Sequence, residues 1–182
     1  HDALPICAAG AELLLVLNAS PCHLEKHQQR AHVLGERIDA IGIPAIYCNL
    51  VGGQDELVFD GASFALDAQK KCCMRLPSFE EALGIVDFDA GCLHSEQLAE
   101  ELSIEAEAYQ ALVLGVRDYI GKTGFKGAII GLSGGIDSAL TLCVAVDALG
   151  ADKVRAVMMP SPYTAQMSLD DSREMIRVLG VR

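Results

Sequence analysis

A glycine-rich turn between an apolar strand and a helix is the feature that most limits how this chain can fold. The turn reads SGGIDS at residues 133–138, and it follows the apolar run GAIIGL at 127–132. Hydrophobic periodicity then predicts a helix at 136–149, a strand at 153–159 and a second helix at 168–179. This alternation of strands and helices predicts a parallel sheet covered by helices. The second half of the chain is therefore expected to be α/β.

Apolar runs in the first half of the chain predict a second region of strands and helices. Gly42 is expected to be the C′ residue that ends a helix, and Asp60 with Gly61 is expected to form a hairpin turn. The expected elements are a strand at 13–17, a helix at 24–41 with an apolar stripe of Leu24, Ala31, Leu34, Ile38 and Ile41, a strand at 43–51 that ends at Gly52 and Gly53, and two short strands flanking the hairpin turn.

The periodic pattern weakens between residues 72 and 103 and then returns. We place the domain boundary near residues 90–103, which gives one domain at 1–95 and another at 96–182. After this boundary, Tyr109, Leu112, Val113, Val116 and Ile120 form a helical stripe that is expected to stop at Gly121.

The charge balance argues against nucleic acid or a membrane as a partner. The chain has 182 residues, with 14 basic and 25 acidic residues and a formal net charge of −11. Such an acidic chain is poorly suited to a phosphate backbone, and no apolar run reaches the roughly 18 residues that span a bilayer. Seven cysteines without a CxxC pair predict reduced thiols, and hence a cytoplasmic protein. Because His1 stands where Met is usual, we expect the natural chain to begin earlier.

The chemistry of the SGGIDS turn predicts a phosphate ligand. Gly134 and Gly135 let the backbone approach a ligand closely, and the first N–H groups of the following helix have no partners inside it. These groups carry a partial positive charge that an anion satisfies. Ser133 and Ser138 are expected to add hydroxyl donors. Asp137 would repel phosphates unless a cation lies between them, so we expect Mg²⁺.

Three other interpretations of this region are weaker. An ordinary βα turn needs a single glycine rather than this combination of residues. The GxGxxG fingerprint of dinucleotide-binding domains is absent. The GKT at 121–123 resembles the end of a Walker A loop, but Val116 stands where that motif requires glycine. We therefore interpret GKT as unrelated to phosphate binding.

The segment GLSGGIDS at 131–138 resembles the pyrophosphate-binding loop of the N-type ATP pyrophosphatases. Residues 108–140 and 157–172 are similar to the synthetase domain of glutamine-dependent NAD⁺ synthetases. Residues 10–26 and 47–63 resemble the nitrilase-like glutaminase domain of the same family. This resemblance implies the C-terminal part of a nitrilase-like α-β-β-α domain. The first β-α-β-α units of a Rossmann-like (adenine nucleotide alpha hydrolase-like) domain would follow it, with a parallel sheet.

The resemblance also implies an activity and a set of site residues. Enzymes of this family adenylylate deamido-NAD⁺ with ATP, release pyrophosphate, and displace AMP with ammonia that comes from glutamine. Members of the synthetase group form homo-oligomers. The residues implied are Gly131, Leu132, Ser133, Gly134, Gly135, Ile136, Asp137 and Ser138 for ATP, Asp137 for the metal, Ser20 and Lys26 for glutamine, 157–161 for the adenine pocket, and 162–171 for an adjoining loop in which Ser168 would cap the next helix.

The catalytic Glu, Lys and Cys of the glutaminase are expected upstream of this segment, which alone is expected to be inactive. Cys7, Cys22 and Cys48 are interpreted as structural, and Asp55 with Glu56 as hairpin residues. Met158 and Met159 fit core packing and ligand contact equally well. Two alternatives remain open: another ATP pyrophosphatase, of the GMP synthetase or tRNA-thiolating type, and a non-catalytic nitrilase-like scaffold.

Overall fold

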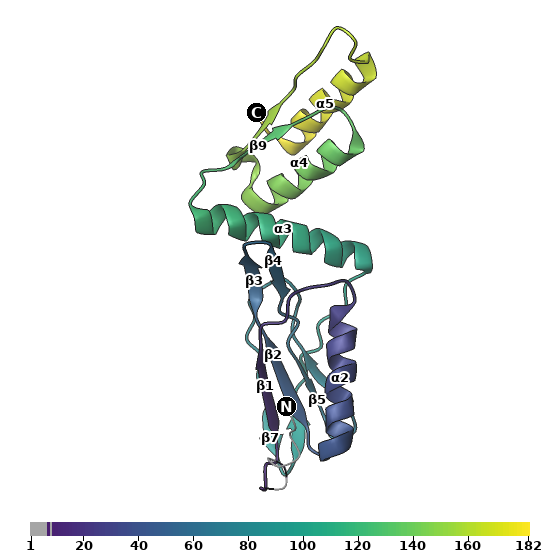
Figure 1. Ribbon diagram of the computed structural model, residues 1–182, viewed down its shortest axis with the longest axis vertical. Helices are drawn as coiled ribbons and strands as arrows, with labels where there is room; N and C mark the ends of the chain where they lie inside the picture. Colours follow the sequence, from purple (N-terminus) through teal and green to yellow (C-terminus); the bar gives the residue numbers. More distant parts are fainter. Residues whose placement is uncertain (1–6, 8) are drawn as a thin grey trace. The chain divides into compact units, whose positions relative to one another are not determined.

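The computed structural model describes Cys7 and residues 9–182, and its contacts divide the chain into two compact units. Both units combine helices and strands (Figure 1), which confirms the predicted α/β class. Within the described residues, no helix is long and apolar enough to cross a membrane. Unit 1 holds the residues up to Gly52 together with Leu57–Ala111, and unit 2 holds Gly53–Glu56 together with Leu112–Arg182.

Unit 1 is built on a mixed sheet whose strands run in the order β1-β2-β5-β6. β1 (Leu14–Asn18) is parallel to β2 (Ala45–Asn49), and β5 (Phe64–Leu66) is antiparallel to both β2 and β6 (Cys72–Arg75). The helix α2 (Lys26–Ile41) connects the two parallel strands. Such a parallel pair needs a crossover connection, and this helix supplies it.

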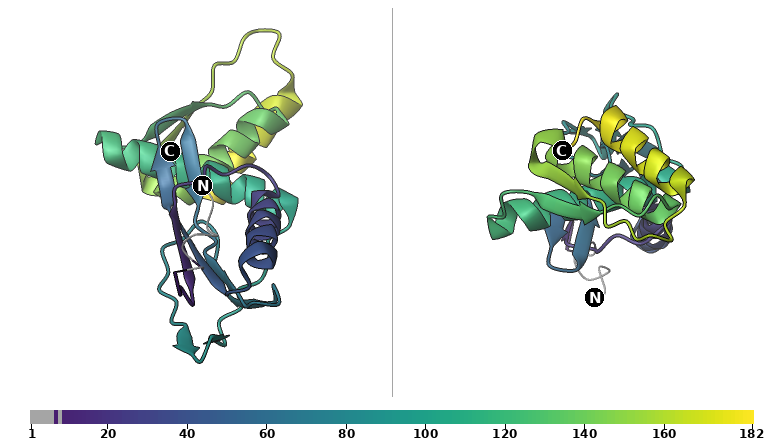
Figure 2. Two further views of the ribbon diagram at one scale, coloured as in Figure 1. Left: turned by 60° about the horizontal axis from the view of Figure 1, so that its bottom comes forward. Right: turned by 90° about the horizontal axis from the view of Figure 1, so that it is seen from above.

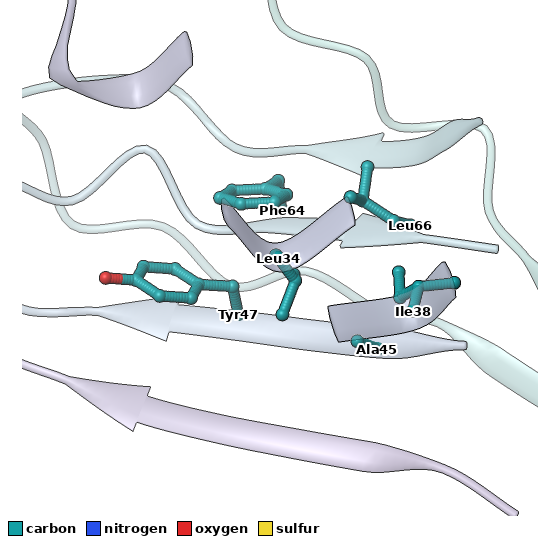
Figure 3. Packing of buried hydrophobic residues seen from close by; sticks show 6 residues of the cluster. All are labelled: Leu34, Ile38, Ala45, Tyr47, Phe64 and Leu66. Carbon is teal, nitrogen blue, oxygen red and sulfur yellow. The ribbon is translucent and has the colours of Figure 1, made fainter. Parts of the chain in front are cut away.

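The core of unit 1 lies between α2 and the middle strands of the sheet, as Figure 3 shows. Tyr47 and Phe64 stack with ring centroids 5.1 Å apart, which adds specific aromatic contact to the buried apolar area. Alternate strand residues face the helix, as the period of a strand requires. The buried cluster consists of Leu34, Ile38, Ala45, Tyr47, Phe64 and Leu66.

The two ends of α2 differ in how well the sequence predicts them. Gly42 has a φ of 71° and its N–H bonds to the carbonyl of Ile38, so the predicted C-terminal glycine is confirmed. The predicted start is wrong, because the helix begins at Lys26 and Leu24 lies outside it with 55% of its surface exposed. Arg30 faces the interior instead and is 7% exposed.

The predicted hairpin at Asp60 and Gly61 is also wrong. β4 (Leu57–Asp60) pairs with β3 (Val51–Gln54), and β5 pairs in the central sheet. β3 therefore contains Gly52 and Gly53 rather than ending at them. The turn lies at Asp55 and Glu56, which confirms the interpretation of these two acids as hairpin residues. The cause is burial: all three residues of β5 are buried, because β5 is an inner strand of the central sheet with β2 on one side and β6 on the other.

The segment with weak periodicity contains a small strand pair and the start of a long helix. β7 (Asp87–Asp89) and β8 (Cys92–His94) are antiparallel, and the sequence pattern predicts neither of them. α3 (Ile104–Thr123) runs past Gly121, where the stripe predicted its end. The division between the compact units falls inside α3, so the boundary near 90–103 stays a prediction.

Unit 2 has the predicted β-α-β-α order. β9 and β10 are parallel, from Val154 opposite Ala128 to Val157 opposite Gly131. α4 and α5 lie side by side in the views of Figures 1 and 2, and they pack on a core that includes Leu142. The elements are β9 (Ala128–Gly131), α4 (Ile136–Leu149), the short 3₁₀ helix η1 (Ala151–Lys153), β10 (Val154–Val157) and α5 (Gln166–Leu179).

The second part of α3 holds the tip of the β3–β4 hairpin. The N–H of Gly53 donates to Oδ2 of Asp118 at 2.7 Å, and Nζ of Lys122 donates to the carbonyl of Gly53 at 2.5 Å. Lys122 also lies 3.3 Å from Asp118. This lysine belongs to the GKT at 121–123, which therefore lies in a helix and holds a carbonyl group rather than forming a phosphate loop.

We expect Asp118→Asn to reduce the free energy of unfolding at neutral pH by about 1.5 kcal/mol, the scale of a charged hydrogen bond. Burial alone would raise the pKa of Asp118, but the N–H of Gly53 and the Lys122 ammonium hold it below its ordinary 3.8. The carboxylate therefore stabilises the fold above the unfolded pKa, and this contribution is lost as the pH falls through the folded pKa.

Urea unfolding of the chain at a series of acidic pH values tests this prediction. Wild type and Asp118→Asn should converge as the pH falls, whereas the exposed Asp171→Asn should follow wild type throughout. A constant difference between wild type and Asp118→Asn across the series would contradict the role given to the carboxylate.

Candidate functional site

The loop between β9 and α4 leaves the first amides of the helix open. Gly134 has a φ of +83°, and Gly135 precedes the helix in an extended conformation. Gly135 has no side chain, and no side-chain hydrogen bond caps α4 in the described structure. The N–H groups at the start of α4 therefore point out of the helix without an internal acceptor, which is the arrangement that binds anions.

The two serines of the loop bind each other. Oγ of Ser138 donates to the carbonyl of Gly135 at 2.9 Å and accepts from the N–H of Ser133 at 3.3 Å. The two hydroxyl oxygens lie 3.1 Å apart, so the proton of Ser133 bridges them. Both hydroxyl protons are engaged inside the loop. The open donors in this arrangement are main-chain amides at the start of α4, and the hydroxyl donors of Ser133 and Ser138 stay a prediction.

Gly134 also lies directly against the first turn of α5. A Cβ atom built on Gly134 would lie 2.6 Å from Cα of Ser168, closer than real Cβ atoms come to other atoms. Ser168 itself is inside α5, which begins at Gln166 after Ala165, so the prediction that Ser168 caps this helix is wrong. The backbone of Ser168 instead packs against Gly134, and this contact limits the position of the loop.

A cavity of about 420 Å³ opens beside the loop, a size typical of small-molecule sites. Ser172 of α5 lines it, is 1% exposed, and its Oγ has no hydrogen-bond partner among the described residues. Asp171 and Glu174 line it on the same side. The other lining residues are Leu132, Gly134, Gly135, Ile136, Ala139 and Met175.

Asp137 lies in the first turn of α4 and is exposed. A carboxylate oxygen is a ligand that Mg²⁺ accepts. The described part of the chain brings together no group of three or more His, Cys, Asp or Glu side chains that could hold a metal ion. The single carboxylate of Asp137 is compatible with Mg²⁺, which often takes one or two carboxylates and completes its shell with phosphate oxygens and waters.

The two methionines after β10 behave differently. Met158 packs partly buried against the core of unit 2, whereas Met159 has 79% of its surface exposed. Met158 thus follows the core-packing interpretation. Met159 is left free at the C-terminal end of the parallel strands, where open α/β sheets bind ligands.

The loop between β1 and α2 places the two residues expected to bind glutamine. The N–H of Ser20 donates to Oδ1 of Asn49 at 2.9 Å, and Nη2 of Arg30 donates to the carbonyl of Ser20 at 2.9 Å. Nε of Arg30 donates to Oγ of Ser20 at 3.2 Å. Lys26 is the first residue of α2, is half-buried, and forms no ion pair with the residues described. The hydroxyl group of Ser20 thus lies in the loop before α2, and the ammonium group of Lys26 lies at the start of α2.

Cys22 lies in the same loop and is no nucleophile there. Burial has the largest effect and, together with the carboxylates of Asp60 and Glu107, raises the pKa of the Cys22 thiol to about 11 against the opposing effect of Arg30. The group is therefore a protonated thiol at neutral pH, and a thiolate is the reactive form. This supports the structural interpretation of Cys22. Cys7 and Cys48 are free thiols as well.

The chain is similar over nearly its whole length to one group of proteins. The profile of the NAD synthase family matches residues 108–182. A glutamine-dependent NAD(+) synthetase of Rhodobacter capsulatus is 47% identical over 182 residues, which is 97% of this chain and 33% of that protein. One of Acinetobacter baylyi is 48% identical over 174 residues, 94% of this chain and 32% of that protein. The chain is thus similar to glutamine-dependent NAD(+) synthetases across both compact units.

Solved structures of this family have the same fold. The glutamine-dependent NAD⁺ synthetase of Acinetobacter baumannii, in complex with adenosine diphosphate, superposes with a TM-score of 0.92 at 45% identity over 97% of this chain and 34% of that one. That of Cytophaga hutchinsonii, at 19% identity, shares the fold with a TM-score of 0.78 over 96% of this chain and 36% of that one. The chain thus spans about a third of the length of the synthetases it matches.

The similarity to glutamine-dependent NAD(+) synthetases covers both compact units, and this range helps to compare the alternatives of another ATP pyrophosphatase and of a nitrilase-like scaffold. A GMP synthetase or a tRNA-thiolating enzyme shares the loop, but the match to glutamine-dependent NAD(+) synthetases extends through the first half of the chain as well. The alternative of a non-catalytic nitrilase-like scaffold stays a hypothesis, because a scaffold derived from the same domain would match over the same range.

Sequence reasoning missed the buried polar residues that support Ser20. Arg30 stands four residues before Leu34 on the buried face of α2, and this spacing was the available signal. Asp60 stands at the predicted hairpin turn, whereas its side chain is 3% exposed and pairs with Arg30. Asn49 gave no signal, because its role depends on a partner 29 positions away in the chain.

Proposed function

We propose that the whole protein of this chain converts deamido-NAD⁺ to NAD⁺ with ATP, using ammonia released from glutamine, and forms AMP, pyrophosphate and glutamate. The observation that carries the proposal is the open amide cluster at the start of α4, held in a chain that is 47% identical to such synthetases across both units. Adenylylation followed by amide formation makes this activity that of a ligase.

Residues Gly131–Ser138 are proposed to bind the triphosphate of ATP. The N–H groups at the start of α4 would donate hydrogen bonds to the departing pyrophosphate and so stabilise its developing negative charge. Because these groups are already fixed in position, they would not need to reorganise. Gly134 allows the loop to lie against Ser168 of α5 at a positive φ, and this contact fixes the position of the amides that would face the phosphates. The segment 157–161 at the end of β10 is proposed to line the adenine pocket, with the exposed Met159 as its apolar contact.

Asp137 is proposed to be the protein ligand of a Mg²⁺ ion. The ion when bound would neutralise phosphate charge and favour the release of pyrophosphate. Asp137 itself would hold the ion beside the loop, and its position in the first turn of α4 keeps the carboxylate next to the open amides. Without the ion, the carboxylate would repel the nucleotide.

Ser20 and Lys26 are proposed to bind glutamine, with the ammonium of Lys26 facing the carboxylate of the substrate. We further propose that the domains 1–95 and 96–182 serve the glutaminase and the synthetase, with the glutaminase triad contributed by other parts of the whole protein. A cytoplasmic homo-oligomer without a nucleic-acid or membrane partner completes the proposal.

The proposed reaction is tested by its products. The whole protein, given deamido-NAD⁺, Mg·ATP and either glutamine or ammonia, should form NAD⁺, AMP and pyrophosphate in equal amounts. Replacing deamido-NAD⁺ with XMP should give no product. Formation of ADP and phosphate in place of AMP and pyrophosphate, or amidation of XMP, would show that the loop serves another reaction.

A further inference from the structure

Arg30 lies on the buried face of α2 and binds the loop that carries Ser20. Its guanidinium is 5% exposed and makes hydrogen bonds to Oγ of Ser20 at 3.2 Å, to the carbonyl of Ser20 at 2.9 Å and to the carbonyl of Pro21 at 3.3 Å. We propose that Arg30 is a positioning residue that fixes the direction of the Ser20 hydroxyl and so selects a carboxylate as the group bound there. This inference rests on the proposed function, because it concerns the glutamine site.

The direction of the hydroxyl follows from the chemistry of its partner. A guanidinium only donates hydrogen bonds, so Oγ of Ser20 must accept from Nε of Arg30. The hydroxyl has a single proton, and this proton is left to be donated elsewhere. Arg30 thus occupies one of the two lone pairs of Oγ and leaves the proton of Ser20 for a ligand acceptor such as a carboxylate. Together with the ammonium of Lys26, this hydroxyl selects an anionic group over the amino group of the same substrate.

A closed ring of hydrogen bonds fixes Arg30 in turn. Asp60 binds the guanidinium in a bidentate way, with Nη1 to Oδ2 at 2.7 Å and Nη2 to Oδ1 at 2.8 Å. Nδ2 of Asn49 donates to Oδ1 of Asp60 at 3.4 Å, and Oδ1 of Asn49 accepts from the N–H of Ser20. The ring thus returns to Ser20 and connects the ends of β2 and β4 with α2. Planar bidentate pairing leaves Arg30 one orientation.

The ring does not need to exist for stability alone. A buried ion pair is costly to desolvate, and apolar residues of similar volume often stabilise a fold equally well. Pre-organisation of a binding group is a use that apolar residues cannot supply, because they offer no donor to Ser20. The geometry around Ser20 is therefore explained by binding.

The test is a double-mutant cycle on the whole protein, with glutamate release measured against glutamine concentration. Arg30→Lys keeps a positive charge beside Asp60 but lacks the planar fork that reaches Ser20. Ser20→Ala removes the hydroxyl. Each variant should raise the KM for glutamine about tenfold, the scale of one hydrogen bond to a charged group, with a smaller change in kcat. The double variant should match the single ones, because both remove the same contact.

The matched control is Arg37→Lys, an exposed arginine of the same helix, which should leave the KM at the wild-type value. Should Arg30→Lys fail to fold, Asn49→Ala replaces it, since it removes the acceptor of the Ser20 N–H without changing a charge. It should raise the KM in the same non-additive way. An unchanged KM, or effects that multiply in the double variant, would overturn the proposal.

Ammonia-supported formation of NAD⁺, measured on the same wild-type preparation, separates this inference from the proposed function. If ammonia gives no NAD⁺, the proposed synthetase function fails, while glutamate release still reports on Arg30. If NAD⁺ forms and the cycle is additive, only the role of Arg30 fails.

Discussion

Replacing Gly134 with alanine is expected to lower the kcat/KM for ATP of the whole protein by about a hundredfold or more. The φ of +83° costs an L-residue roughly 1–2 kcal/mol, and the new Cβ would lie 2.6 Å from Cα of Ser168. Because the obstacle is backbone, the loop must move away from α5 and carry its amides with it. A displacement of about 1 Å can reduce catalysis a hundredfold. Initial rates of NAD⁺ formation against ATP concentration measure the effect.

Gly124→Ala is the matched control for this variant. Gly124 has a φ of +75°, and a Cβ there would meet no atom within 4 Å, so the substitution adds backbone strain without a collision. It should reduce stability by about 1 kcal/mol and leave the kcat/KM for ATP within a few-fold of wild type. If Gly134→Ala were as active as Gly124→Ala, the contact between the loop and α5 would have no role in nucleotide binding.

Replacing Asp60 with alanine is expected to reduce the free energy of unfolding by about 3–5 kcal/mol, the cost of leaving a buried charge without its partner. Arg30 would lose both of its carboxylate bonds while 5% exposed, and Asn49 would lose an acceptor. Urea unfolding of the chain, followed by circular dichroism, measures the loss. It is large beside the total stability of a typical domain, about 5–15 kcal/mol.

The double variant Arg30→Met with Asp60→Leu is the control for the charge. It replaces both partners with apolar side chains and should recover most of the stability lost by Asp60→Ala, because no charge is left buried. A loss below about 1 kcal/mol for Asp60→Ala would show that water reaches Arg30, against its observed burial. A double variant no more stable than Asp60→Ala would assign the loss to packing.

The elements of unit 2 could be predicted because their signals are local. The helix expected at 136–149 is α4 (Ile136–Leu149), because Gly135 stands just before its apolar segment and Gly150 just after it. The hairpin expected at Asp60 and Gly61 failed for the opposite reason. The turn signal there is real, as the φ of 64° at Gly61 shows, but it leads the chain from one sheet into another. Which strands pair depends on burial across the fold, which spacing does not encode.

The candidate site divides in the same way. The nucleotide loop is contiguous, so SGGIDS could be recognised from its residues. The contact of Gly134 with Ser168 crosses 34 positions, and the ring around Ser20 joins β2, β4 and α2. Lys26 and Ser20 were expected at the glutamine site, but Arg30 could be understood only once its partners were placed. Buried polar networks assemble from distant segments, and single-sequence patterns do not reveal them.

A crystal structure of the whole protein with a non-hydrolysable Mg·ATP analogue is the most direct test of whether the amides at the start of α4 bind the triphosphate of ATP. We expect phosphate oxygens within hydrogen-bond distance of the amides of residues 134–138, with the metal ion held by the carboxylate of Asp137. A triphosphate bound elsewhere, with these amides facing water, would contradict this expectation.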